Sequence, residues 1–193
     1  MSTPIKLIVG LGNPGPSYSA TRHNAGYWLI EALAAAHHLN FKSIASHKVR
    51  MAEWCLDQHS CYLVMPTCFM NESGLSIRLL SNFYKLLPQE ILIAHDELAL
   101  NPGIARLKIG GGHAGHNGLR DIITHLHTQD FYRLRLGIGH PGTRTAVTNY
   151  VLSKPSNHDN TLITAAITAS ITVMPQIVMG HIAAAMQELH TAT

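Results

Sequence analysis

Charged side chains are scarce in this 193-residue sequence, because Asp, Glu, Lys and Arg make up only 13% of it. The 14 basic and 11 acidic residues leave a net charge of +3. This charge permits a polyanionic partner but excludes binding that depends on a broad basic surface. Hydrophobic residues make up 46% of the chain, which excludes a disordered protein. The length predicts a single domain, residues 1–193.

Cysteine is also scarce, and Cys55, Cys61 and Cys68 show no metal-ligand spacing. An odd, small number of cysteines does not suit a disulfide framework. The apolar stretch near the N-terminus is too short for an export signal. We therefore expect a protein of the reducing cytoplasm.

Charge is absent altogether from residues 160–187, so this segment raises the question of a membrane span. Pro175, Gly180 and the many threonines argue against a spanning helix. The threonines recur at helical spacing, and isoleucines form a second stripe beside them. We expect a soluble amphipathic helix pair, ended or kinked at Pro175, and no membrane contact.

No nucleotide-binding motif is complete. A G-x-G-x-x-G pattern occurs at Gly10, Gly12 and Gly15 after an apolar run, but Pro14 and Pro16 prolong a loop where a dinucleotide site needs a helix. No Gly-Lys-Ser/Thr follows, as a P-loop requires, and no G-x-S-x-G elbow for a nucleophilic serine is present. These gaps argue against nucleotide cofactors and serine hydrolase chemistry.

The pattern of apolar residues alternates between strand and helix periods. Strands are predicted at residues 5–10, 51–56, 62–65, 91–96, 105–109 and 133–138, and helices at 25–36, 73–86, 119–126 and 147–152. Asn24 is expected to cap the first helix, and the second helix shows helical spacing at Leu75, Leu79, Leu80 and Phe83. The two strands at 51–65 read as a hairpin. The predicted fold class is therefore α/β, a single domain with a twisted mixed β-sheet flanked by helices.

Polar residues stand where the predicted strands give way to loops. These are Asn13, His23, Asn71, the pair His95 and Asp96, and the pair His116 and Asn117. In open α/β sheets, ligands collect beyond the carboxyl ends of strands. A neutral histidine there can take a proton from water, a carboxylate behind it can orient the ring, and amides can hold a carbonyl. The pattern favours a hydrolase whose nucleophile is water.

Each of these residues also has a purely structural interpretation. Asn13 before a proline is typical of a turn, Asp96 can cap the next segment, and Asn117 can cap the helix that follows. Most of the 14 histidines, His190 among them, are expected on the surface of a protein with few charges. Only the joint placement of the polar residues indicates a site.

Two other chemistries remain open. His113 and His116 are three residues apart, with His125 and His127 nearby, but such spacing is common by chance in a histidine-rich chain and no fitting carboxylate or thiolate joins it. Cys68 is more typical of a small apolar filler than of a nucleophile. We expect no metal and no cofactor.

Five long motifs occur in a fixed order: VGLGNPGPSYSATRHNAGY, PTCFMNESG, HDELALNPG, GGGHAGHNGLRDI and RLRLGIGHPG. Together they resemble bacterial peptidyl-tRNA hydrolase and cover most of residues 5–155. The resemblance implies a metal-free esterase that cleaves the ester between peptide and tRNA. The implied partner is peptidyl-tRNA, met at its 3′ CCA end and acceptor region by a monomeric cytoplasmic enzyme.

Position in these motifs also implies roles for individual residues. His23 would be the catalytic base and Asp96 its partner. Asn13, Asn71 and Asn117 would hold substrate and water. Met70 and His116 would line the pocket, and Tyr18 would lie at its mouth. The implied contacts to tRNA phosphate are Lys108, Arg135 and Arg144.

An alternative function is also compatible with this fold. An RNA-splicing relative in plastids shares these motifs, and by that resemblance the chain would be a catalytically silent RNA-binding module. The complete set of base, partner and amides favours the enzyme. The sequence departs from the usual family pattern at Met51, Glu72, Ala99 and Asn101, none of which is an implied catalytic group.

Overall fold

The computed structural model describes residues 3–192 as helices and strands in alternation. The strands are β1 (Leu7–Gly10), β2 (Lys42–Ile44), β3 (Val49–Leu56), β4 (His59–Pro66), β5 (Ile91–Glu97), β6 (Ala105–Ile109) and β7 (Tyr132–Gly137). The α-helices are α1 (Ala25–Ala36), α2 (Ser73–Phe83), α3 (Asn117–Leu126), α4 (Val147–Val151), α5 (Asn157–Val178) and α6 (Ile182–Ala192).

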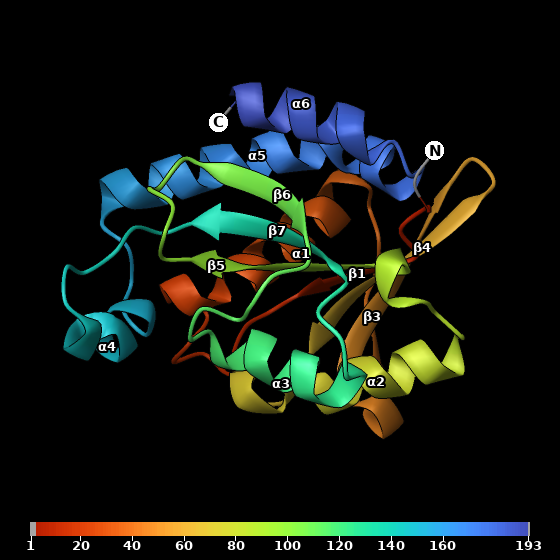
Figure 1. Ribbon diagram of the computed structural model, residues 1–193, viewed down its shortest axis with the longest axis horizontal. Coiled ribbons are helices and arrows are strands. Elements are labelled where there is room, and N and C mark those ends of the chain that lie inside the picture. Colours follow the sequence, from red (N-terminus) through yellow and green to blue (C-terminus); the bar gives the residue numbers. More distant parts are fainter. Residues whose placement is uncertain (1–2, 193) are drawn as a thin grey trace.

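The strands form one seven-stranded mixed sheet in the order β2-β3-β4-β1-β5-β7-β6. The central strands β4, β1, β5 and β7 are parallel, whereas β2, β3 and β6 join antiparallel at the two sides. Helices α5 and α6 lie over one face, and α2 and α3 over the other (Figure 1). The predicted fold class, a mixed sheet flanked by helices, is confirmed.

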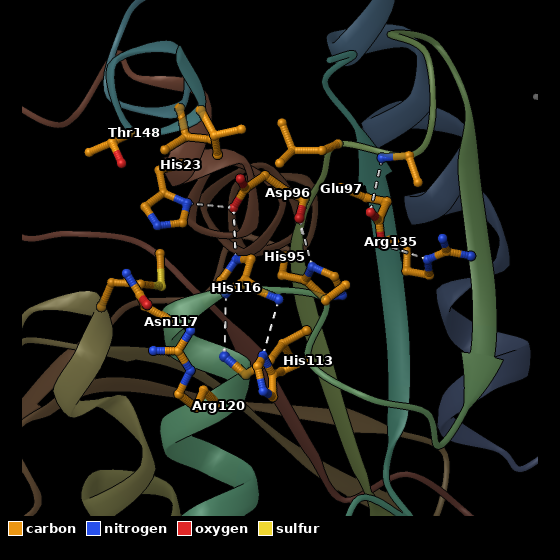
Figure 2. Close-up of a pocket in the computed structure, with 18 of the residues that line it drawn as sticks. His23, His95, Asp96, Glu97, His113, His116, Asn117, Arg120, Arg135 and Thr148 are labelled. Atoms are coloured by element: carbon orange, nitrogen blue, oxygen red, sulfur yellow. Dashed lines mark hydrogen bonds and ion pairs between the residues drawn. The ribbon is translucent and has the colours of Figure 1, made fainter. Parts of the chain in front are cut away.

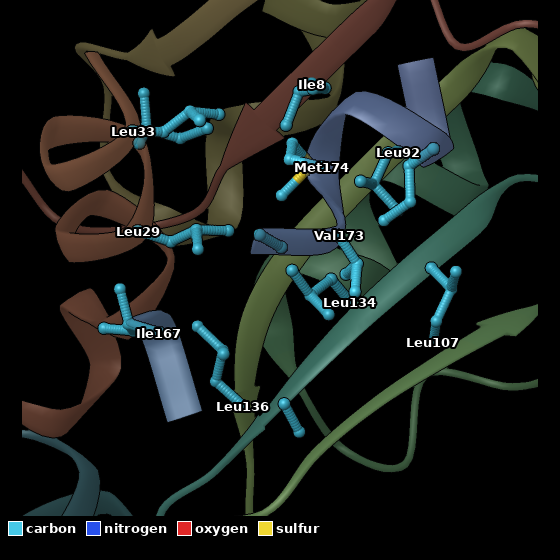
Figure 3. Packing of buried hydrophobic residues seen from close by; sticks show 14 of the residues in the cluster. Ile8, Leu29, Leu33, Leu92, Leu107, Leu134, Leu136, Ile167, Val173 and Met174 are labelled. Atoms are coloured by element: carbon cyan, nitrogen blue, oxygen red, sulfur yellow. The ribbon is translucent and has the colours of Figure 1, made fainter. Parts of the chain in front are cut away.

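Alternating strand residues divide the core into two apolar layers. Ile8 and Leu92 face α1, α5 and α6, where they pack with residues such as Leu29 and Met174 (Figure 3). Their neighbours along the strands, such as Val9, face α2 and α3. This alternation explains why the central strands are apolar on both sides, as parallel strands covered by helices require.

The first two glycines of the G-x-G-x-x-G pattern are needed for close packing of the chain and not for a backbone turn. A Cβ on Gly10 would overlap the carbonyl oxygen of Gly26 in α1, and a Cβ on Gly12 would lie 2.6 Å from the ring of Tyr27. Only Gly15 has a positive φ, +98°, where an L side chain is strained. The first two glycines therefore let α1 approach β1 closely, and no helix starts at the pattern itself.

Several predicted boundaries were wrong. The short exposed strand β2 was not predicted, and the hairpin turn is confined to residues 57 and 58, because β4 begins at His59. Helix α2 ends at Phe83 instead of residue 86, and Phe83 is 67% exposed although its spacing predicted a buried face. The buried face of α2 is built from small serines together with Ile77 and Leu80.

The charge-free segment forms the predicted helix pair, α5 and α6. Four threonines line the exposed side of α5, and each hydroxyl donates to the carbonyl four residues earlier: Thr161, Thr164, Thr168 and Thr172. The helix does not end at Pro175 but continues to Val178. By length and composition alone α5 could cross a membrane, yet its apolar stripe, including Ile163 and Ile167, is buried against the domain core.

Helix α6 contacts the edge strand β6 through a histidine. The Leu107 amide donates to His190 Nε2 at 3.0 Å. His190, expected at the surface, is partly exposed, and its ring also completes the hydrogen bonding of this amide at the edge of the sheet.

Candidate active site

A cavity of about 1150 Å³ lies beyond the carboxyl ends of the parallel strands. It is lined by ten of the eleven residues predicted for the site: Asn13, His23, Met70, Asn71, Asp96, Lys108, His116, Asn117, Arg135 and Arg144. Tyr18 does not line it; its ring packs edge-on against Phe69, with centroids 6.2 Å apart, and Phe69 lines the cavity. We call Asn13, His23, Asp96 and His116 the catalytic half, and Lys108, Arg133, Arg135 and Arg144 the basic half.

The register of the sheet brings His23 to Asp96. Strand β1 pairs with β5, with Gly10 opposite Ala94, so the loop after β1 and the end of β5 meet at one edge. His23 lies in the 3-10 helix η1 (Arg22–Asn24), and its Nδ1 is 2.9 Å from Asp96 Oδ1. A proton on Nδ1 leaves the lone pair on Nε2, on the side of the ring away from Asp96 (Figure 2).

His116 is a second partner of the same carboxylate oxygen. Its Nε2 lies 3.0 Å from Asp96 Oδ1, and its Nδ1 accepts from the Leu119 amide at 3.3 Å. Both contacts are satisfied when Nε2 carries the proton. The prediction that Asn117 caps α3 was wrong: His116 is the N-cap residue and Asn117 is the first helical residue, exposed in the cavity wall.

The electrostatics of the catalytic half follow from these contacts. Burial opposes the charged form of His23, but the charge of Asp96 and its hydrogen bond outweigh this, so the pKa of His23 is raised above 6.5. Burial likewise opposes ionisation of Asp96, but the adjacent His23 and His116 hold the pKa of its carboxyl well below its ordinary value. Asp96 is therefore a carboxylate at neutral pH.

His95, predicted as a polar site residue beside Asp96, has a different setting. Its Nδ1 donates to the Asp96 carbonyl at 2.7 Å, and its ring packs edge-on against His116, with centroids 5.1 Å apart. Burial and the neighbouring His116 lower the pKa of His95 to about 3. His95 is thus a neutral ring packed against His116.

Two asparagines position the loops of the catalytic half. Asn24 accepts from the Asn13 amide at 2.8 Å and donates to the Asn13 carbonyl at 3.0 Å. The Asn13 side chain in turn accepts from the Met70 amide at 2.8 Å. Asn24 is the N-cap residue of α1, as predicted, but its side chain bonds Asn13 and makes no capping bond. This chain of bonds fixes the segment that presents Asn71.

The basic half lies on β6, β7 and the segment before α4. Arg135 donates from Nε to Glu97 at 2.9 Å (Figure 2). Burial opposes the charge of Glu97, but its bonds from the Ala99 amide and Arg135 hold the pKa of its carboxyl below the ordinary value. Glu97 therefore fixes one edge of the guanidinium, and Arg144 is exposed in the cavity wall.

Two of the cations on these strands, Arg106 and Arg133, were not singled out from the sequence. In the antiparallel pair, Arg106 lies opposite Arg135, and Lys108 lies opposite Arg133. Like charges directly opposite each other destabilise a sheet. The sequence shows each pair at a spacing of two residues, Arg106-x-Lys108 and Arg133-x-Arg135, which places both members of a pair on one face of a strand. Which cations lie opposite each other depends on the register of β6 and β7, and this is known only from the structure.

The predicted alternative metal cluster around His113 is not formed within residues 3–192. His113 accepts from the Gly115 amide, and His125 pairs with Asp121. The potential ligand atoms that do gather in the described part belong to His23, Asp96 and His116, all within 4.8 Å. Each of the two rings has a hydrogen-bonding proton to give the carboxylate, so the three groups satisfy one another.

With this geometry in place, the chain can be assigned to a family. The family model described as peptidyl-tRNA hydrolase matches residues 7–193, and the chain belongs to that family. A peptidyl-tRNA hydrolase of Legionella pneumophila is 52% identical over 186 residues, 96% of this chain and 98% of the relative. One from Coxiella burnetii is 50% identical over 191 residues, 99% of this chain and 100% of the relative.

Solved structures agree with the assignment. The crystal structure of peptidyl-tRNA hydrolase from Acinetobacter baumannii superposes with a TM-score of 0.96 at 42% identity, covering 100% of this chain and 98% of the other. A peptidyl-tRNA hydrolase solved in complex with n-propanol gives a TM-score of 0.95 at 43% identity, covering 98% and 96%. The resemblance carried by the five motifs is confirmed.

Proposed function

We propose that this chain hydrolyses the ester bond of peptidyl-tRNA and so returns tRNA from aborted translation, with His23 as general base. The observation that carries the proposal is the hydrogen bond from His23 to a buried, ionised Asp96 in a cavity of about 1150 Å³. An orienting carboxylate on one ring nitrogen leaves the other as the proton acceptor.

In the proposed reaction, His23 Nε2 takes a proton from water while the water oxygen attacks the ester carbonyl carbon. Asp96 stabilises the imidazolium that forms. The exposed amides of Asn71 and Asn117 can donate to the carbonyl oxygen as it becomes negative. The bond to the ribose oxygen then breaks, the imidazolium returns its proton to that oxygen, and the products are a peptide carboxylate and free tRNA.

The basic half supports a polyanionic substrate. Lys108, Arg135 and Arg144 line the same cavity, and their positive charge attracts a polyanion. We therefore assign Lys108, Arg135 and Arg144 to phosphates of the acceptor region, and the cavity floor between Met70 and His116 to the 3′ CCA end and the peptide. We propose further that the enzyme acts as a monomer in the cytoplasm, where its three unpaired cysteines stay reduced.

A release assay with purified protein tests the proposal. Peptidyl-tRNA should be cleaved faster than aminoacyl-tRNA, and EDTA should leave the rate unchanged. Activity lost on chelation and restored by zinc would assign the His23, Asp96 and His116 atoms to a metal instead. Tight tRNA binding without cleavage would make the chain a silent RNA-binding module.

A further inference from the structure

Arg133 has the burial of a core residue and the charge of a surface one. It is 3% exposed, whereas the side chain of Arg135, two residues along the same strand, is 24% exposed. Among the described residues Arg133 forms no ion pair with a carboxylate. A buried charge needs hydrogen bonds to replace the water it has lost, so the partners of this guanidinium show what it does.

Those partners are backbone carbonyls of one loop. Arg133 Nη1 donates to the Gly112 carbonyl at 2.6 Å, and Nη2 donates to the Gly111 carbonyl. Its Nε is buried without a hydrogen-bond partner in the described structure. The loop carbonyls thus take one N–H of each Nη, and the Nε is buried. These bonds set Arg133 apart from the other cations of the basic half, which form no hydrogen bond with this loop over residues 3–192.

The loop that Arg133 holds is rich in glycine, and its other bonds near the site are internal, from the Gly115 amide to the His113 ring and from the His116 amide to the His113 carbonyl. Residues 110–115 read GGGHAG, and Gly110, Gly111, Ala114 and Gly115 all have positive φ. Glycine-rich segments lose the most backbone entropy on ordering and offer no side chains to pack. The Gly110 amide donates to the Phe131 carbonyl at 3.0 Å and so bonds the start of the loop to the segment before β7. The bonds from Arg133 attach the next two residues of the loop, Gly111 and Gly112, to β7 itself.

This loop leads directly to the site. It ends at His116, which bonds Asp96 and caps α3, and Asn117 follows at once. A shift of about 1 Å in a catalytic group can cost about 100-fold in rate. The position of the loop therefore sets where His116 and Asn117 stand relative to the carboxylate.

We infer that Arg133 is a positioning residue that anchors the glycine loop, and that it is not a phosphate contact. The inference rests on the proposed function only for the roles of His116 and Asn117. The anchor itself is a property of the loop, which can be measured without any turnover.

The experiment compares Arg133→Lys and Arg133→Gln with the matched pair Arg135→Lys and Arg135→Gln. Two substrates are used, peptidyl-tRNA and a short peptidyl ester that lacks the tRNA body. We expect both Arg133 variants to lower kcat by about 10- to 100-fold on both substrates. A lysine keeps the charge but cannot span two carbonyls, so charge alone should not rescue the rate. Arg135→Gln should weaken binding of peptidyl-tRNA and spare the short ester.

Amide hydrogen exchange of residues 110–117 supplies the readout that is independent of activity. Exchange there should rise in both Arg133 variants and stay unchanged in the Arg135 variants. This measurement tests the anchor even if the wild-type chain does not cleave peptidyl-tRNA. A failure of the proposed function and a failure of the anchor are therefore distinguishable.

A rescue variant guards against simple unfolding. A Cβ on Gly112 would meet no heavy atom within 4 Å, and this glycine has no positive φ, so Gly112→Ala should stiffen the loop without a clash. We expect Gly112→Ala alone to be active and the double variant with Arg133→Lys to recover part of the lost kcat. Wild-type kcat in Arg133→Lys, or a loss confined to peptidyl-tRNA binding, would overturn the inference.

Discussion

The two halves of the cavity differ in how their charged side chains are arranged. In the catalytic half, the buried carboxylate of Asp96 is hydrogen-bonded through one oxygen by both His23 and His116. In the basic half, cations face one another across β6 and β7. The first arrangement is ready for charge that develops during a reaction, and the second for charge that the substrate already carries. Mutations in the two halves should therefore differ in what they change.

His23→Ala should have the largest effect. Removing a general base typically costs about 10²–10⁴-fold in rate, so kcat should fall by that order while KM for peptidyl-tRNA stays near wild type. Single-turnover kinetics, together with a melting curve to show that the variant is folded, check this. A folded variant that keeps more than about a tenth of wild-type kcat would assign the base elsewhere.

Asp96→Asn should lower kcat with less effect on KM, and by no more than loss of the base, because the imidazole remains but is no longer held in its orientation. The charge of Asp96 raises the pKa of His23, so the variant should also shift the acid limb of the rate profile to lower pH. A changed kcat with an unmoved limb would mean that Asp96 acts only by orienting the ring.

The pH dependence of the wild-type rate gives a third test. His23 accepts a proton only when neutral, and its pKa is raised above 6.5 by Asp96 against the effect of burial. The rate should therefore fall as pH drops through a midpoint above 6.5 and level off at higher pH. A midpoint below 6.5, measured as kcat/KM across buffers of constant ionic strength, would contradict this electrostatic assignment.

Arg135→Ala should act on binding alone. Two or three phosphate contacts predict a log–log salt slope of roughly −1.5 to −3, and loss of one contact should make it shallower by about 0.7 to 0.9. Titrations of peptidyl-tRNA at several salt concentrations measure the slope. An equal loss of kcat on a short peptidyl ester would instead show that the Glu97 pair supports the catalytic half.

His190 lies outside both halves, so His190→Ala should change stability and leave kcat and KM unchanged. Loss of one hydrogen bond of about 1 kcal/mol corresponds to about 2–4 °C in Tm for a chain of this size. Burial and Arg106 lower the pKa of His190, so the folded state favours the neutral ring. Its stabilising effect is present above 6.5 and is lost as pH falls below that value. Melting curves at neutral and mildly acidic pH test both statements.

Local sequence pattern predicted the elements whose neighbours are all apolar, such as β1 and β5, because burial on both faces leaves a continuous signal. It failed for β2, which has three residues and little burial, and for Phe83, whose helical spacing fits a face that the sheet does not cover. The motifs gave the members of the site, but not the pairings within it. That His116 bonds Asp96, that Asn24 holds Asn13 and that Arg133 holds a loop all depend on which distant segments meet.

The exposed threonine side of α5, all of it within the described residues, has neither free hydroxyl donors nor charged side chains with which to hold a polyanion. Its hydroxyls are bonded to carbonyls of their own helix, and residues 160–187 bring no fixed charge to that face. A polyanion that collides there releases no counterions and gains nothing by staying. Unproductive encounters of tRNA with this side of α5 should therefore be brief.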